Sequence, residues 1–118
     1  MNKNQSDIAF HPILGDFTPI EELLYHDCPY VFTFRDAAGS LSLAYLVSTD
    51  AHSTRYLAVR IGADELTELK SGKRSIRSVF IGHALDINLD EGANILSVLE
   101  KPIHLFRPDD LPPDNLYL

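Results

Sequence analysis

The strongest structural signal in the sequence is the stretch Tyr25-His26-Asp27-Cys28-Pro29-Tyr30-Val31-Phe32-Thr33-Phe34. Its second half alternates aromatic residues with others, at Tyr30, Phe32 and Phe34. Side chains two apart share one face of a strand, and aromatic rings suit the pleated surface of a sheet. We therefore predict a strand over 29–35 as the spine of the core, with Asp27 and Pro29 as a structural turn before it.

Length and composition limit the class of protein. A chain of 118 residues with 45% hydrophobic and 23% charged residues is typical of a globular domain. A single cysteine, Cys28, cannot form an internal disulfide, which fits a reducing compartment. The start of the chain lacks the apolar run of a secretory signal, and no stretch approaches the ~20 apolar residues of a membrane span. We expect a cytoplasmic protein without membrane association, with residues 1–7 disordered and 8–118 forming one domain.

Two more alternating runs follow the aromatic strand, at 41–48 and 54–61. Between the first two strands, Asp36-Ala37-Ala38-Gly39 has Asp at its start and Gly at its end, as a type I turn prefers. This pattern predicts an antiparallel hairpin followed by a third strand. Because the second face of the hairpin is also partly apolar, we expect some cover on both sides of the sheet.

Short helices are predicted in three places. Thr18-Pro19-Ile20-Glu21 has the composition of a capping box, which favours a helix of about two turns over 19–24. An extended conformation over 17–24 is the alternative. Residues 64–70 have acids in the first turn, lysine in the last and Gly72 just beyond, so they also predict a helix. Ser75 is expected to cap one further helical turn.

The last third of the chain is less regularly patterned. Residues 85–89 alternate as a strand does, and 90–94 has the composition of a turn. The apolar run 95–99 is too short to classify by periodicity. A further short strand is expected at 103–106, and the prolines of 108–118 predict an extended tail.

These elements sum to an α+β fold, with a small, mostly antiparallel sheet of about 4–6 strands and two or three short helices. The apolar end of the tail, Leu116, Tyr117 and Leu118, is expected to act as an interaction tail that docks on the body of the domain or on another chain.

Three local patterns make the chain resemble a family of small bacterial and phage-associated proteins that share a domain of unknown function. They are an acidic, tyrosine-bearing turn entering an aromatic strand at 22–32, the run Arg55-Tyr56-Leu57-Ala58-Val59, and the segment 66–77. Cys28 stands where the family pattern has glycine before the proline. The resemblance covers roughly residues 16–80. It implies a compact domain and supplies no catalytic residues.

Residues His26, Asp27 and Cys28 are of the types that form nucleophilic sites. Neighbours on a turn point in different directions, however, and such sites are assembled from distant segments. We therefore expect no catalytic residue here, although a small enzyme using Cys28 with a histidine remains a hypothesis. In the structural interpretation, Asp27 bonds the turn backbone and Pro29 fixes the entry to the strand.

No metal or cofactor site is predicted. The histidines are spread along the chain without the short spacings of zinc sites. His83 and Asp86 are three apart, which would place them together only on a helix. A phosphate-binding loop is also not predicted, since Thr67 stands where the Walker motif needs glycine.

One basic turn, 70–77, contrasts with the formal net charge of −7. Its cations, which Arg60 could extend from the third strand, are Lys70, Lys73, Arg74 and Arg77. They suit contact with a phosphate, a nucleic acid or an acidic protein face. Alternatively, they are solvated charges that complement the C-terminal dipole of the helix before them.

Two functions follow from these features. The first is a non-enzymatic interaction or accessory module that binds a protein partner, including a second copy of itself as a homodimer. The second is a nucleic-acid-binding or nucleotide-binding accessory protein that uses the basic turn. Net acidity weakens the second hypothesis, because a polyanion is repelled by an acidic protein.

Overall fold

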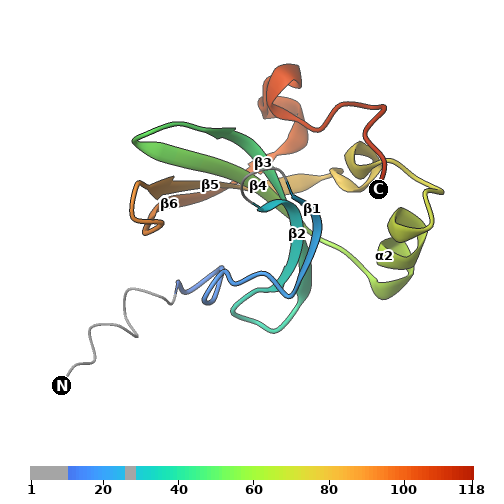
Figure 1. Ribbon diagram of the computed structural model, residues 1–118, viewed down its shortest axis with the longest axis horizontal. Coiled ribbons are helices and arrows are strands. Elements are labelled where there is room, and N and C mark those ends of the chain that lie inside the picture. The colour runs from blue at the N-terminus through green and yellow to red at the C-terminus, as the bar shows by residue number, and fades with distance from the viewer. Residues whose placement is uncertain (1–10, 26–28) are drawn as a thin grey trace.

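A single antiparallel sheet forms the centre of the computed structural model, which describes residues 11–25 and 29–118 (Figure 1). Its six strands lie side by side in chain order, so each pairs with the next. The strands are β1 (Glu21–Tyr25), β2 (Pro29–Arg35), β3 (Leu41–Thr49), β4 (Ser53–Arg60), β5 (His83–Asp90) and β6 (Ile95–Pro102). The connections at 36–40, 50–52 and 91–94 are short, as antiparallel hairpins allow, whereas the longer segment 61–82 connects β4 to β5.

The predicted aromatic strand, hairpin and third strand are confirmed as β2, β3 and β4. The turn between β2 and β3 is also confirmed. There the Asp36 carboxylate accepts hydrogen bonds from the backbone N–H groups of Ala38 and Ser40, at 3.0 and 2.9 Å. Gly39 has a φ of +84°, which glycine adopts without a steric penalty.

Both faces of the sheet carry a hydrophobic core, as the sequence pattern predicted. Alternate residues of the central strands enter a larger core, where Val31, Leu43 and Leu57 are fully buried. The residues between them enter a smaller, aromatic core that contains Phe32 and Phe34. Because the central strands are covered on both sides, they hold the two cores together.

Different parts of the chain cover the two cores. The larger core is closed by the helix α2 (Ala63–Lys70) and the 3₁₀ turn η1 (Ile76–Val79). It is also covered by the C-terminal segment, with the 3₁₀ turns η2 (Ile103–Leu105) and η3 (Pro108–Asp110). The smaller core is closed by the segment before β1, through Leu14 and Phe17.

The expectation of an α+β fold with two or three short helices is wrong. The described residues form a six-stranded sheet with one α-helix and isolated 3₁₀ turns, so the protein is mostly sheet. The predicted helix at 64–70 is confirmed as α2, and the turn after Ser75 as η1. No helix among the described residues is long and apolar enough to cross a membrane.

The predicted helix over 19–24 is wrong, and the extended alternative holds. Glu21–Tyr25 is strand β1, paired with β2 from Glu21↔Thr33 to Tyr25↔Pro29. A capping box is a local signal worth about 1 kcal/mol, and pairing along a whole strand outweighs it. Of the predicted turn that precedes β2, Pro29 is the first residue of β2, while Asp27 lies outside the described residues.

The last third also differs in part from expectation. The strand at 85–89 and the turn after it are confirmed, and the unclassified run at 95–99 belongs to β6. The predicted strand at 103–106 is wrong, because these residues form η2 and place Phe106 in the larger core. Pro102 lacks a backbone N–H, so it marks a natural end for strand pairing.

The two cores should both be needed for stability. We expect Phe34→Ala in the smaller core and Phe80→Ala in the larger core each to lower the free energy of unfolding by about 3–5 kcal/mol. Both side chains are fully buried, so each truncation leaves a cavity. Urea unfolding measures the loss, with the exposed Leu105→Ala as control. A loss below about 1 kcal/mol for either phenylalanine would contradict the two-core description.

Candidate binding cleft

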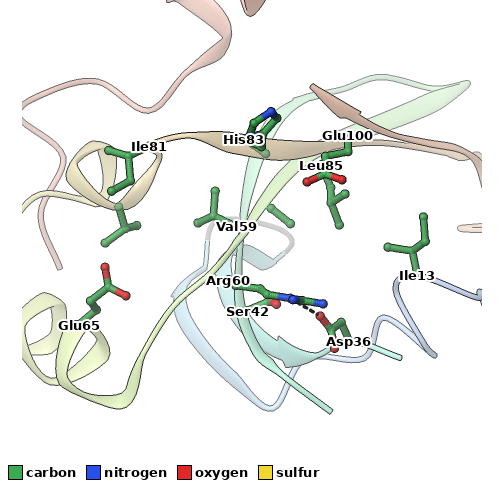
Figure 2. Close-up of a pocket in the computed structure, with 13 residues that line it drawn as sticks. Ile13, Asp36, Ser42, Val59, Arg60, Glu65, Ile81, His83, Leu85 and Glu100 are labelled. Carbon is green, nitrogen blue, oxygen red and sulfur yellow. Dashed lines mark hydrogen bonds and ion pairs between the residues drawn. The ribbon is translucent and has the colours of Figure 1, made fainter. Parts of the chain in front are cut away.

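Strands β4 and β5 separate at one end, and a cleft opens between them. Their pairing runs from Ser53↔Asp90 to Ala58↔Leu85 and stops there. Beyond that point Arg60 has no pairing partner on β5, although it still pairs with Ser42 on β3. The cleft has a volume of about 480 Å³ (Figure 2).

The separation leaves backbone polar groups facing the cleft. The N–H of Ile61 donates to the carbonyl oxygen of Leu41 at 3.0 Å, so the backbone polar groups of Ile61 point toward β3. In an antiparallel strand, alternate residues direct their backbone groups to opposite sides. Those of Arg60 therefore point to the side of β5, where they have no strand partner.

The charged centre of the cleft is Arg60, held in place by Asp36. The Nε of Arg60 donates to Oδ2 of Asp36 at 3.0 Å, while the arginine side chain stays 69% exposed. Figure 2 shows the arginine side chain extending from β4 to this carboxylate, on the side away from His83 and Leu85. The two terminal nitrogens of Arg60 bond no described residue, so they are available to a ligand.

Asp36 is well suited to hold the guanidinium. Burial by itself raises the pKa of this carboxyl, but hydrogen bonds from the Ser40 and Ala38 backbone and from Arg60 outweigh it. The pKa of Asp36 therefore lies below its usual value, and the group is ionised at neutral pH. An ionised, buried partner fixes the orientation of the arginine fork.

Ser42 adds a second polar group to the cleft. It lies directly across from Arg60 on β3, lines the cleft and is only 3% exposed. Its hydroxyl makes no hydrogen bond with any residue in the described part of the chain. A buried hydroxyl without a partner costs free energy, so a bound group that satisfied it would be favoured.

The walls combine apolar and acidic side chains. The apolar residues include Ile13, Val59, Ile81 and Leu85. Two acids, Glu65 on α2 and Glu100 on β6, lie on either side of the central arginine (Figure 2). The ring of His83 stands at the rim and points away from Arg60 in the same view. The cleft therefore suits a group with one negative charge and an apolar neighbour.

The residues predicted for the basic turn mostly bind groups of this chain. Lys70 pairs with Glu21 at 2.9 Å, and Arg74 pairs with Glu68 at 3.1 Å. Arg77 donates to the carbonyl oxygen of Phe80 at 2.7 Å. Lys73 is exposed, and its side-chain ammonium has no partner in the described ranges. None of the four lines the cleft that contains Arg60, so the structure does not join Arg60 to the basic turn.

The apolar tail lies against the body of the domain. Leu116 and Leu118 pack against the larger core, while Tyr117 is 51% exposed. The carbonyl oxygen of Leu116 accepts a hydrogen bond from the N–H of Ile76 at 2.9 Å. Figure 1 shows the end of the chain returning beside η1.

A network of ion pairs that the sequence analysis missed fastens the C-terminal segment to the sheet. Arg55 on β4 donates to Asp86 on β5 through two nitrogens, at 2.8 and 2.9 Å, and to Asp110 on η3 at 2.9 Å. The Nζ of Lys101 lies 3.4 Å from Oδ2 of Asp86 and 4.7 Å from the ring centre of Phe106. The sequence signal was Asp86, a carboxylate between the apolar residues Leu85 and Ile87 of a strand.

Two further groups of residues were weighed as sites from the sequence, the His26-Asp27-Cys28 cluster and a metal site. His26, Asp27 and Cys28 lie outside the described residues. His83 and Asp86 are on a strand, where residues three apart face opposite sides. Within residues 11–25 and 29–118, no group of three or more His, Cys, Asp or Glu could hold a metal ion.

Comparisons of the chain with protein-family models, with curated protein sequences and with solved structures give no match. The resemblance to small bacterial and phage-associated proteins therefore stays a prediction. Function has to be argued from the geometry of the cleft and of the surface.

The ion-pair network should make stability depend on pH. Burial by itself raises the pKa of Asp86. Hydrogen bonds and charge from Arg55 and Lys101 lower it by more than burial raises it, so the pKa of Asp86 lies below its usual value. The contribution of Asp86 to the free energy of unfolding is therefore present above its unfolded-state pKa of about 3.9. It is lost as the pH falls through the lower pKa of the folded state.

We expect Asp86→Asn to reduce the free energy of unfolding at pH 7 by about 1–3 kcal/mol and to flatten the loss of stability below about pH 4. Urea unfolding between about pH 7 and pH 2 measures both effects. The matched control is Asp109→Asn, because Asp109 is exposed and forms no ion pair with a described residue. If stability falls equally steeply below about pH 4 in Asp86→Asn and in the wild type, the ion pairs of Asp86 do not cause the loss of stability in acid.

Proposed function

We propose that the protein is a non-enzymatic interaction module that binds a carboxylate-bearing segment of a partner protein in the cleft between β4 and β5. The observation that carries this proposal is Arg60, which is anchored through one nitrogen while its other two nitrogens face the cleft. The guanidinium fork matches the two oxygens of a carboxylate.

The residues around Arg60 favour the binding of a carboxylate in the cleft. Two further donors belong to the same part of the fold: the hydroxyl of Ser42, directly across from Arg60 on β3, and the backbone N–H of Arg60, which lies beyond the end of the β4–β5 pairing. An acceptor with two oxygens could satisfy more than one of these donors at once. Leu85 and Ile13 then provide an apolar surface for the neighbouring side chain of the bound segment.

The acidic walls favour a protein segment over a nucleic acid. A chain of phosphates entering the cleft would pass close to Glu100 and to Glu65, and like charges repel, although Arg74, 3.9 Å from Glu65, offsets part of the charge of Glu65. A peptide can instead present a single carboxylate to Arg60 and neutral or basic groups to the two glutamates. The basic turn supports no second proposal, because three of its four cations already bind groups of this chain.

Affinity for a short peptide should be low. Arg60 is largely exposed, and its charge is partly offset by Asp36, so the ion pair with a ligand is worth about 1 kcal/mol or less. Most of the binding free energy must come from the apolar contacts. A dissociation constant on the order of 1 mM is expected for a tripeptide.

The test uses three blocked tripeptides and backbone amide NMR of the isotope-labelled protein. Ac-Ala-Leu-Leu-COOH offers a terminal carboxylate, Ac-Ala-Leu-Glu-amide offers a side-chain carboxylate, and Ac-Ala-Leu-Leu-amide offers none. We expect at least one carboxylate peptide to shift the amide signals of residues 58–61 and 83–85, and the neutral peptide to leave them unchanged.

Arg60→Gln should weaken the binding of the carboxylate peptide by roughly two- to fivefold, whereas Arg35→Gln should not change it. Arg35 is a matched control because it is also an exposed strand arginine beside the same turn, bonded to the Gly39 carbonyl oxygen. Equal binding of the neutral peptide, or no effect of Arg60→Gln, would rule the proposal out.

A further inference from the structure

The two edges of the sheet differ in how well they are protected. An edge strand exposes unpaired backbone groups that can pair with another chain, and proteins protect such edges with charges, bulges and short strands. The described sheet ends at β1 on one side and β6 on the other. Both edges carry some of this protection, and β1 carries more of it than β6.

Strand β1 is a protected edge. It has five residues, begins with Glu21 and Glu22, and its pairing with β2 is interrupted by two register shifts. Lys70 also reaches Glu21 from α2, at 2.9 Å. Charge, irregularity and short length all oppose the addition of another strand here.

Strand β6 is a less protected edge. It has eight residues and keeps an unbroken register with β5 from Ser97↔Asn88 to Pro102↔His83. Leu96 and Leu99 are 63% and 60% exposed, and neither belongs to one of the two cores. A leucine exposed in the middle of a regular edge strand is an apolar surface that a second chain could cover.

The sequence of β6 is complementary to itself. When two copies pair antiparallel about a two-fold axis through Leu99, the two Leu99 side chains face each other. Ser97 then lies opposite Lys101 of the second copy, and Val98 lies opposite Glu100. No like charges are placed directly across from each other.

Charge also favours a second copy at this edge. The chain carries a formal net charge of −7, so two copies repel over most of their surfaces. Over the regular part of β6, the one acid and the one base, Glu100 and Lys101, cancel. The edge is therefore a place where two acidic molecules can approach closely.

We infer that the protein forms a homodimer by antiparallel pairing of β6 with β6 of a second copy, which joins the two sheets into one of twelve strands. The inferred twelve strands are the six of one copy and the same six of the other. This inference rests on the edge strand and does not depend on ligand binding at Arg60.

The first experiment is sedimentation equilibrium of the full chain over about 1–200 μM. The wild type is expected to populate a dimer, and Leu99→Arg should raise the dimer dissociation constant by roughly tenfold or more, because it places two cations together on the two-fold axis. Leu105→Arg is the control, since Leu105 is equally exposed at 60% but lies in η2. A wild type that stays monomeric throughout this range overturns the inference.

A second experiment is independent of whether Leu99→Arg folds. In a Cys28→Ser background, Leu99→Cys should form a disulfide between copies under mild oxidation, because residues directly opposite on paired strands have Cβ atoms about 4.5–5.5 Å apart. Leu105→Cys should cross-link at least fivefold less. Equal cross-linking at the two positions, or none at Leu99→Cys, would show that β6 does not pair in this register.

Discussion

Burial of both faces of the central strands is the constraint on which the structure depends. Strand β3 lies between β2 and β4, and its residues alternate between the two cores, with Leu43 in one and Ala44 in the other. A sheet covered on both sides needs enough chain to cover it. The segment before β1 covers the smaller core, and α2, η1 and the C-terminal segment cover the larger one. The short helices and the proline-rich tail are therefore parts of the core, because without them the central strands would be exposed to water.

The cleft is a consequence of this arrangement. After Ala58, β4 leaves β5 and continues through Ile61 into α2, which has to reach the larger core. The departure costs strand pairing and leaves backbone groups of Arg60 without a strand partner. Asp36, which follows β2, holds the Arg60 side chain at the edge of this opening. A polar opening at the end of a sheet, with an anchored guanidinium beside an apolar wall, is the kind of place where a single carboxylate can be recognised.

Charge is distributed to hold segments together as much as to meet partners. Arg55 joins β4 to β5 and to η3, Lys70 joins α2 to β1, and Arg74 closes the turn after α2. The Arg55 network is the most buried of these, so it contributes most to keeping the C-terminal segment in place. Arg60 differs, because its buried partner uses one nitrogen and leaves the others facing the cleft.

The sequence predicts the strands with strict alternation, from the aromatic run at 29–35 to the run at 54–61, because period-two burial on a two-sided sheet leaves a pattern in the residues themselves. It also determined α2, since its acids, lysine and following glycine are local signals. Long-range contacts make 21–25 a strand and 103–105 a 3₁₀ turn, because pairing with β2 and closure of the larger core outweigh weak local preferences. The cleft too was decided in three dimensions. Asp36, Ser42 and Arg60 lie on three segments, and only the register of β3 with β4 and the point at which β4 leaves β5 bring them together.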